Sequence, residues 1–180
     1  MAAAPNPFAV FEYLDGTHRA IDEQLRQLQA LLYAIEEKGL NQANREAARR
    51  VLIFFNGEAR QHHLDEEKHI FPALLASQDE ALVQTTEHLI QDHGWLEENW
   101  LQIAPSIEAA TQGNQWFDLD ELRHALEVFE ALYQDHMTLE ETIAYPQARG
   151  RLPAADMLGM GREMAKRRSI KRAQSLQQAD

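Results

Sequence analysis

The sequence predicts an all-α fold, an up-down-up-down bundle of four long helices followed by a short C-terminal helix. Apolar residues recur in four stretches at alternating steps of three and four, the spacing of a helix that buries one face. No stretch alternates apolar and polar residues strongly enough to indicate a strand. The connections between the stretches are mostly short, which favours antiparallel neighbours.

The first two helices are defined by their inward stripes. The stripe of the first helix is Phe11, Leu14, His18, Ile21, Leu25, Leu28, Leu32 and Ile35. Gly39 follows it at a position suited to a helix C-terminus. The stripe of the second helix is Leu52, Phe55, Ala59, His62, Glu66, Ile70 and Ala73.

Two pairs of residues have the spacing of a capping box and predict where the next helices begin. Ser77 with Glu80 opens the third helix, and Asp118 with Glu121 opens the fourth. The third stripe is Leu82, Thr86, Leu89, His93, Leu96, Trp100 and Ile103. The fourth is Leu122, Leu126, Phe129, Tyr133, His136, Glu140 and Ile143. Residues 111–115, which include Gly113 and Asn114, form the longest loop.

The chain divides into a bundle domain, residues 8–148, and a basic extension, residues 149–180. Met157, Met160 and Met164 fall on one side of the short C-terminal helix, so we expect it to pack on the bundle. The basic residues are expected to be solvated or to balance the acidic body, with partner binding as the alternative. They are Arg162, Lys166, Arg167, Arg168, Lys171 and Arg172.

Composition narrows the classes of function. A chain of 180 residues with 44% hydrophobic residues suits one globular domain. The absence of cysteine excludes disulfides and thiolate chemistry. A net charge of −12 disfavours nucleic acid as a partner and suits a protein that handles cations. Without an apolar run of membrane-spanning length or a signal peptide at Met1–Phe8, we expect a cytoplasmic protein that does not contact a membrane.

Each of the four inward stripes is interrupted by a histidine, and two also by a glutamate one turn later. Burying an unpaired carboxylate costs several kcal/mol, so buried ionisable groups are paired or bind metal. His18 and His62 are equidistant from a turn near residue 40, and His62 and His93 are nearly so from one near residue 78. His93 and His136 flank the third turn in the same way. At about 1.5 Å per residue, the four rings lie at one level.

Glu66 and Glu140 lie one turn beyond His62 and His136 on the same faces. Four imidazoles and two carboxylates are therefore expected to converge on one point in the interior. Imidazole suits iron, zinc, copper and nickel, and a carboxylate can bridge two ions. Two bridging glutamates with two histidines per ion would hold a pair of iron ions, with coordination positions left open for a small molecule.

Helices two and four also share a longer pattern. His62 and His136 each begin an HxxxE segment that continues with a second glutamate, an aromatic residue and a proline at the same offsets. The two segments read HHLDEEKHIFP and HMTLEETIAYP. The two helices are therefore predicted to present equivalent half-sites, and each proline to end or kink its helix at a corresponding place.

The ordered pattern of a leading histidine, an HxxxE, a lone histidine and a second HxxxE resembles the hemerythrin HHE cation-binding family. The resemblance covers residues 8–148 and implies a hemerythrin-like bundle with a non-haem di-iron centre. It implies that His18 and His62 bind one iron and that His93 and His136 bind the other, with Glu66 and Glu140 bridging. The resemblance leaves open whether an oxo or a hydroxo group also bridges the two iron ions.

The sequence departs from the oxygen-carrying members of the family. Those carriers have two histidines four residues apart on the third helix, whereas His88 and His93 lie five apart and cannot share one face. We assign His93, which lies in the apolar stripe. The carriers also have an aspartate with different spacing where this chain has Glu140. These departures favour a module that binds or senses oxygen or a related small molecule, such as peroxide or nitric oxide. The alternative is a di-iron enzyme or iron-handling protein, acting in peroxide or nitric oxide reduction, iron–sulfur cluster repair or iron storage.

Other residues have mainly structural interpretations. His63 and Glu67 form an alternative HxxxE, but Phe55 and Ala59 set the inward face on His62. His69 and His124 are expected to be partly buried. Packing in the core or at its rim is expected of Trp95, Trp100, Trp116 and Tyr133. Tyr133 is the best candidate to hydrogen-bond a ligand. The expected outer partners of the site are Glu67, Asp92, Asp135 and Glu141. No pattern of catalytic nucleophile or nucleotide binding is present, so no catalytic residue is assigned.

Overall fold

The computed structural model describes residue 6 and residues 9–177, with side chains described up to residue 167. It confirms the all-α fold, and the described residues contain no strand. The first rod of the bundle is α1, Ala9–Lys38. The second consists of α2 (Gln42–Phe54), a π-helical turn η1 (Phe55–Ala59) and α3 (Arg60–His69).

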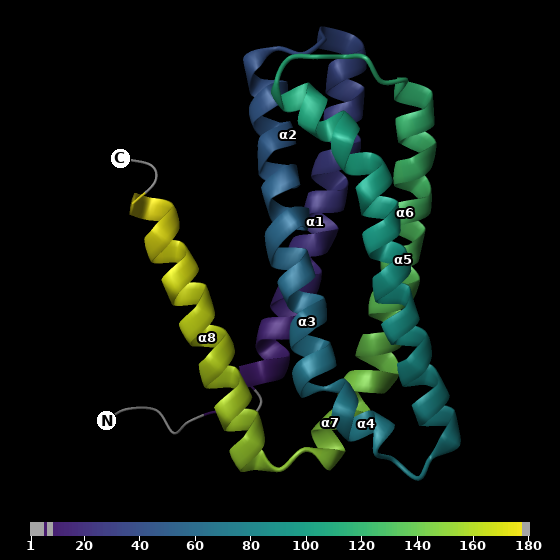
Figure 1. Ribbon diagram of the computed structural model, residues 1–180, viewed down its shortest axis with the longest axis vertical. Helices are drawn as coiled ribbons and strands as arrows, with labels where there is room; N and C mark the ends of the chain where they lie inside the picture. The colour runs from purple at the N-terminus through teal and green to yellow at the C-terminus, as the bar shows by residue number, and fades with distance from the viewer. Residues whose placement is uncertain (1–5, 7–8, 178–180) are drawn as a thin grey trace.

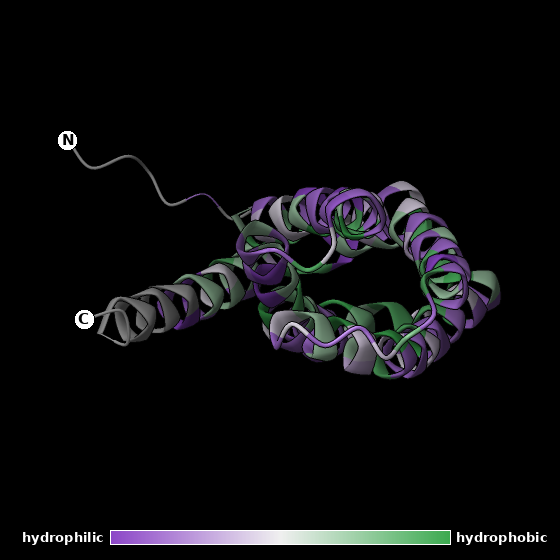
Figure 2. Cartoon of the chain, turned by 90° about the horizontal axis from the view of Figure 1, so that it is seen from above, coloured by the Kyte–Doolittle hydropathy of each residue, from purple (hydrophilic) through white to green (hydrophobic). Residues whose placement is uncertain are grey.

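A short helix α4, Phe71–Leu75, follows α3. The third rod is α5, Glu80–Thr111. The fourth consists of α6 (Leu119–Leu139), a π-helical turn η2 (Glu140–Ala144) and α7 (Tyr145–Arg151), and α8 spans Ala154–Gln177. In Figure 1 the four rods run side by side, and the connection from α5 to α6 is a longer loop that crosses the top of the bundle. Seen from above they form a ring, in which α1 contacts α2 and α6, and α5 contacts the same two helices (Figure 2).

Helix ends follow local chemistry, with one difference from the prediction. Gly39, with a positive φ of 66°, ends α1, and its N–H donates to Ile35 O at 2.8 Å. Asp118 caps α6 as predicted, accepting from the N–H groups of Asp120 and Glu121. The predicted Ser77 capping box is wrong, because Asp79 is the N-cap of α5. Aspartate is itself a strong N-cap and stands directly before the first helical residue, so it takes the role that the more distant serine would have had.

The stripes predicted for the four rods are buried with three exceptions. Leu52 and Ala73 are only partly buried, and their neighbours Val51 and Leu74 are buried instead. Ile143 was predicted to face inward but is 39% exposed, and Ala144 is fully buried in its place. A π-helical turn closes i to i+5 hydrogen bonds and so holds more residues than an α-helical turn. The inward face after Glu140 therefore falls one residue later than a regular helix would place it.

The buried apolar side chains form two clusters, separated along the bundle. The upper apolar cluster includes Ile21, Ala59, Leu96 and Tyr133, and the lower apolar cluster includes Leu14, Ile70, Leu89 and Ala144. Along each rod the predicted ligands lie between a member of one cluster and a member of the other. The polar residues therefore form a single layer that is sealed above and below by apolar side chains.

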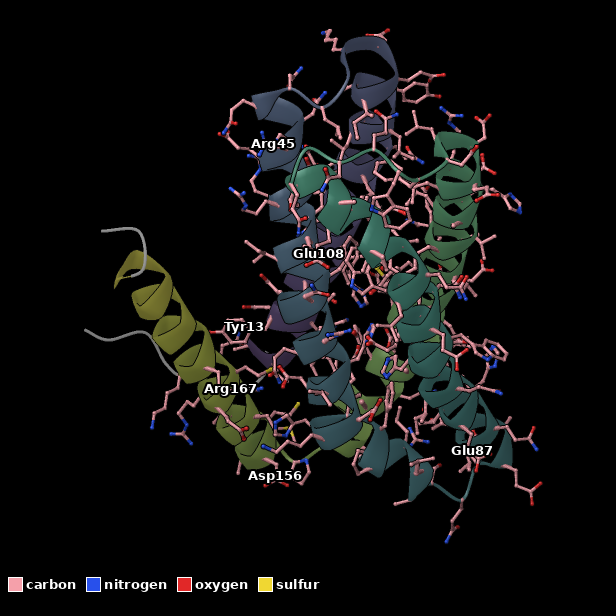
Figure 3. All side chains as sticks on the ribbon, turned by 45° about the horizontal axis from the view of Figure 1, so that its top comes forward. Tyr13, Arg45, Glu87, Glu108, Asp156 and Arg167 are labelled. Atoms are coloured by element: carbon pink, nitrogen blue, oxygen red, sulfur yellow. The ribbon has the colours of Figure 1, made fainter. Side chains whose placement is uncertain are left out.

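Helix α8 is longer than the short helix predicted and lies against α1 and α3 before it extends away from the bundle (Figure 1). Met157 and Met164 are buried and Met160 is partly buried in the lower apolar cluster, which confirms the predicted packing. Arg167 lies on the side of α8 that faces the bundle (Figure 3), with its Nη2 2.6 Å from Asp65 Oδ1. Side chains beyond it, including the predicted basic residues Arg168, Lys171 and Arg172, lie outside the described residues.

None of the described helices combines the length and the apolar character that crossing a bilayer requires.

Candidate metal centre

The structure brings all six predicted ligand residues to one point between the four rods. Helix α1 supplies His18, α3 supplies His62 and Glu66, α5 supplies His93, and α6 with η2 supplies His136 and Glu140. Every one of these side chains is at most 5% exposed, and both glutamates are fully buried. The convergence follows from the matched heights of the histidines along antiparallel rods. Their role as metal ligands stays a prediction.

The six residues form two overlapping groups. In the first, one donor atom from each of His18, His62, Glu66 and Glu140 lies within 4.8 Å of the others. In the second, the same holds for Glu66, His93, His136 and Glu140. The two glutamates belong to both groups, whereas each histidine belongs to one. This is the arrangement expected of two neighbouring ion sites that share their carboxylates.

The distances within each group suit donors that surround an ion. His18 Nε2 lies 3.1 Å from Glu140 Oε2, and His62 Nε2 lies 3.4 Å from Glu66 Oε1. His93 Nε2 lies 3.4 Å from Glu66 Oε2, and His136 Nε2 lies 3.3 Å from Glu140 Oε1. Two ligands at right angles on one ion, with bonds of about 2.1 Å, lie ~3 Å apart.

Several buried donor and acceptor atoms in the layer have no hydrogen-bond partner. They are both ring nitrogens of His62 and of His136, Nε2 of His93, Oε2 of Glu66 and both carboxylate oxygens of Glu140. Buried polar atoms are normally hydrogen-bonded, because an unpaired one costs about 1–3 kcal/mol. A cation placed among these lone pairs would satisfy them together. The donor set therefore fits a metal centre better than a purely structural polar network.

A second ring of carboxylates orients the histidines. Glu141 Oε1 accepts from His18 Nδ1 at 2.8 Å, and Glu67 Oε1 accepts from His93 Nδ1 at 2.8 Å. Asp92 Oδ2 lies 3.5 Å from His136 Nδ1. A carboxylate that holds the Nδ1 proton leaves the Nε2 lone pair free to point inward, as in metal-bound histidines. Four carboxylates were expected to lie beside the histidines, and Glu67, Asp92 and Glu141 do so. The fourth, Asp135, is solvent-exposed.

Burial and charge shift the ionisation of the layer. Burial alone would lower the pKa of His18, but the carboxylate of Glu140, 3.1 Å from its Nε2, raises that pKa to about 9. In the same way the charge of Glu140 and contacts with Asp92 and Glu140 raise the pKa of His136 to about 10. Burial and the charge of Glu140 raise the pKa of Glu66 to about 7. The imidazoles outweigh burial at Glu140 and lower its pKa well below the usual value.

One polar contact of the site, the Tyr145 hydroxyl, was missed by the sequence reasoning. The hydroxyl donates to Glu66 and lies 3.0 Å from His18 Nε2, and the two rings stack at 5.4 Å. Tyr145 belongs to the repeated aromatic–proline pair, which was interpreted only as a helix end. Tyr133 was expected to pack in the core or at its rim, with a hydrogen bond to a ligand as the alternative. It is buried among Phe55 and Phe129, and no hydrogen bond joins it to any of the six residues.

The other four histidines differ in burial and in their distance from the layer. His88 is 54% exposed, with Nε2 3.7 Å from Asp92 Oδ2, so α5 brings His93 and not His88 into the layer. His63 lies beside the layer, and one of its ring nitrogens lies within 4.8 Å of ring nitrogens of His93 and His136. His69 is buried, and its Nε2 lies 3.6 Å from Glu163 Oε2 on α8. His124 was expected to be partly buried but is 80% exposed, because its position on α6 faces away from the other rods.

Comparisons with known proteins show which family the sequence resembles. The sequence profile described as the hemerythrin HHE cation binding domain matches residues 9–148, a range that contains all six predicted ligands. A protein of Haemophilus influenzae, described as an uncharacterized protein, is 32% identical to the chain over 171 residues. That alignment covers 93% of this chain and 96% of the relative.

Proposed function

This chain belongs to the hemerythrin HHE cation-binding family, and we propose that its polar layer binds two iron ions that reversibly engage oxygen or a related small molecule. The observation that carries the proposal is the pair of overlapping donor groups, in which Glu66 and Glu140 are shared. Each group offers two imidazoles and two carboxylates. A mixed set of nitrogen and oxygen donors is one that iron accepts.

The charges of the site favour two divalent ions. Once ions displace the protons of His18 and His136, Glu66 and Glu140 leave two negative charges in a layer with no lysine or arginine among its six residues. Glu67 and Glu141 add further negative charge at its edge, each hydrogen-bonded to a histidine. Cations in the layer offset this charge and remove the cost of the unpaired buried atoms.

A small molecule is the expected second ligand because the protein supplies few donors. Six residues shared between two ions leave open coordination positions, and a bound iron pair supplies the reducing electrons and binding positions that oxygen requires. The apolar clusters above and below the layer exclude bulk water from these positions. The open positions would therefore lie in surroundings from which bulk water is excluded.

The first test is metal stoichiometry. Protein stripped with a chelator and titrated anaerobically with ferrous iron should bind two equivalents, and His18→Ala or His93→Ala should each bind one. His124→Ala is the matched control, because that histidine is 80% exposed. Circular dichroism confirms that each variant is folded. Uptake that is not stoichiometric, or that is unchanged in both site variants, would overturn the proposal.

The second test concerns the small molecule. On exposure to oxygen the reconstituted protein should develop near-ultraviolet absorption, and removal of oxygen should reverse it. Stoichiometric iron without any such response would remove the oxygen role and leave the metal site. Turnover of hydrogen peroxide or nitric oxide above background would instead favour the alternative, an enzyme or iron-handling protein on the same scaffold.

A further inference from the structure

We propose that a small pocket between the second and third rods is the path by which a small neutral molecule reaches the ion held by His93 and His136. His63 lies at the inner end of this pocket, and the ion pair of Arg60 with Glu97 lies at its mouth. The inference rests on the proposed function, since the path needs an ion to lead to.

The pocket lies where η1 and the start of α3 face α5. Five of its lining side chains belong to the upper apolar cluster, namely Phe55, Ala59, Leu96, Trp100 and Tyr133. The pocket therefore interrupts the apolar seal on that side of the polar layer. The space that a water-sized sphere can occupy in it is about 10 Å³, which is room for about one such molecule. Its size and mostly apolar lining suit a small neutral molecule, because an ion would lose its hydration there.

The inner end of the pocket is next to the layer. One ring nitrogen of His63 lies within 4.8 Å of ring nitrogens of His93 and His136. The ring of His63 also stacks on that of His93 with centroids 4.1 Å apart, so a single imidazole separates the pocket from a predicted ligand. His63 Nε2 is buried without a hydrogen-bond partner, so rotation of the ring breaks no hydrogen bond at that atom. His63 is thus placed as a movable partition between the pocket and the layer.

The mouth of the pocket is closed by two charged side chains. Arg60 Nε donates to Glu97 Oε2 at 2.8 Å, and Nη2 of the same guanidinium donates to Glu97 Oε1. The pair joins the start of α3 to α5, and its two side chains are 39% and 40% exposed. Ion pairs this exposed contribute little to stability, so this one can open at a small cost in free energy. The closed pair separates the pocket from bulk water, and the open pair admits a small molecule.

The first experiment measures entry into the pocket of the metal-free protein. Trp100 lines the pocket, and it is the sole tryptophan once Trp95 and Trp116 are replaced by phenylalanine. The rate at which dissolved oxygen quenches the phosphorescence of Trp100 then reports access. The chain has no cysteine, so Arg60→Cys provides a single thiol for a bulky disulfide-linked label.

Unlabelled Arg60→Cys should be quenched faster than the parent protein, because the ion pair is lost. The label should make quenching slower than in the parent, and its release by a reductant should restore the faster rate. Glu97→Cys gives the same test from the other side of the mouth. Glu127→Cys, at a 67% exposed position on α6, is the matched control. Quenching unchanged by the labels at positions 60 and 97 would overturn the proposal.

The second experiment tests whether the pocket leads to the ions. In the ferrous protein, the label at position 60 should slow the association of nitric oxide at least about tenfold. Iron content and the equilibrium affinity for nitric oxide should not change, because the label alters the path and not the bound state. Association at the unlabelled rate in protein with normal iron content would overturn the proposal. A wild type that binds no iron would instead contradict the proposed function.

Discussion

The half of the site built on α3 and the half built on α6 and η2 share a sequence pattern, and the structure shows how far the likeness extends. In each half the first glutamate enters the centre. The second reaches across to a lone histidine on another rod, Glu67 to His93 and Glu141 to His18. The aromatic residue then stacks on that same histidine, Phe71 at 5.5 Å and Tyr145 at 5.4 Å.

The differences lie in single side chains at equivalent positions. Tyr145 carries a hydroxyl that donates to Glu66, and Phe71 has none. His63 stands where the other half has Met137. The backbone differs as well, since η2 begins at Glu140 whereas Glu66 lies within α3. Equivalent patterns therefore build two similar halves, and a few substitutions make their surroundings unequal.

The largest expected effect comes from removing a carboxylate that both groups share. Glu140→Gln removes the negative charge that faces His18, His93 and His136, so both ions should bind at least about 100-fold more weakly. Glu66→Gln should cause a comparable loss if the two halves contribute equally. Competition titration with a chelator measures both, and Glu127→Gln at a 67% exposed position is the control. Loss of only one ion in Glu140→Gln would contradict a shared role.

The second effect is pH dependence. In the metal-free protein the pKa of His18 is about 9 and that of His136 about 10, so each ion must displace a proton below these values. Affinity should rise about tenfold per pH unit for each ion between about pH 6 and 8. Chelator competition at several pH values tests this, and affinity independent of pH would contradict it.

Metal affinity is expected to rise with pH, whereas the stability that these histidines give the metal-free protein should fall with pH. Both histidines have a pKa above the unfolded value of 6.5, so their protonated forms stabilise the fold fully below that pH. This contribution is lost as the pH rises through about 9 to 10. Chemical denaturation of the stripped protein measures this contribution as the difference in the free energy of unfolding between wild type and His18→Ala. That difference should be smaller at about pH 10 than at about pH 6. A stability difference of the opposite sign between His18→Ala and wild type would count against the assigned charge states.

The third effect concerns the two carboxylates, Glu67 and Glu141, that hydrogen-bond to histidines of the two halves. Glu141→Gln should weaken the ion beside His18, and Glu67→Gln the ion beside His93, each by about 10–100-fold. The reason is that each variant loosens the orientation of one imidazole without removing a ligand. Two-step titration curves distinguish the ions. Equal weakening of both steps by either variant would mean that the two groups are not independent.

The smallest expected effect concerns the hydroxyl that only one half has. Tyr145→Phe leaves a buried oxygen of Glu66 without its donor and should lower the free energy of unfolding of the metal-free protein by about 1–3 kcal/mol. The melting temperature should fall by about 2–4 °C for each kcal/mol. Tyr133→Phe is the matched control, because no hydrogen bond joins Tyr133 to the six residues. A larger loss in the control would contradict this assignment.

Much of the fold could be predicted because it depends on local periodicity. Steps of three and four place His18, His93 and their apolar neighbours on inward faces whatever the rest of the chain does. The register failed at Ile143, since η2 adds a residue to its turn and the sequence carries no signal of it. The start of α5 was misplaced for a simpler reason, the choice between Ser77 and Asp79 as its cap.

The sequence by itself determined which residues face the interior and that four histidines share one level, because rise and periodicity are properties of a single helix. Only the tertiary structure decided which contacts form between the rods. It paired Glu67 with His93 and Glu141 with His18, and it placed the Tyr145 hydroxyl on Glu66. It also stacked the ring of His63 on that of His93. Such contacts depend on the rotation and spacing of neighbouring helices, which packing of the whole bundle sets and no single segment encodes.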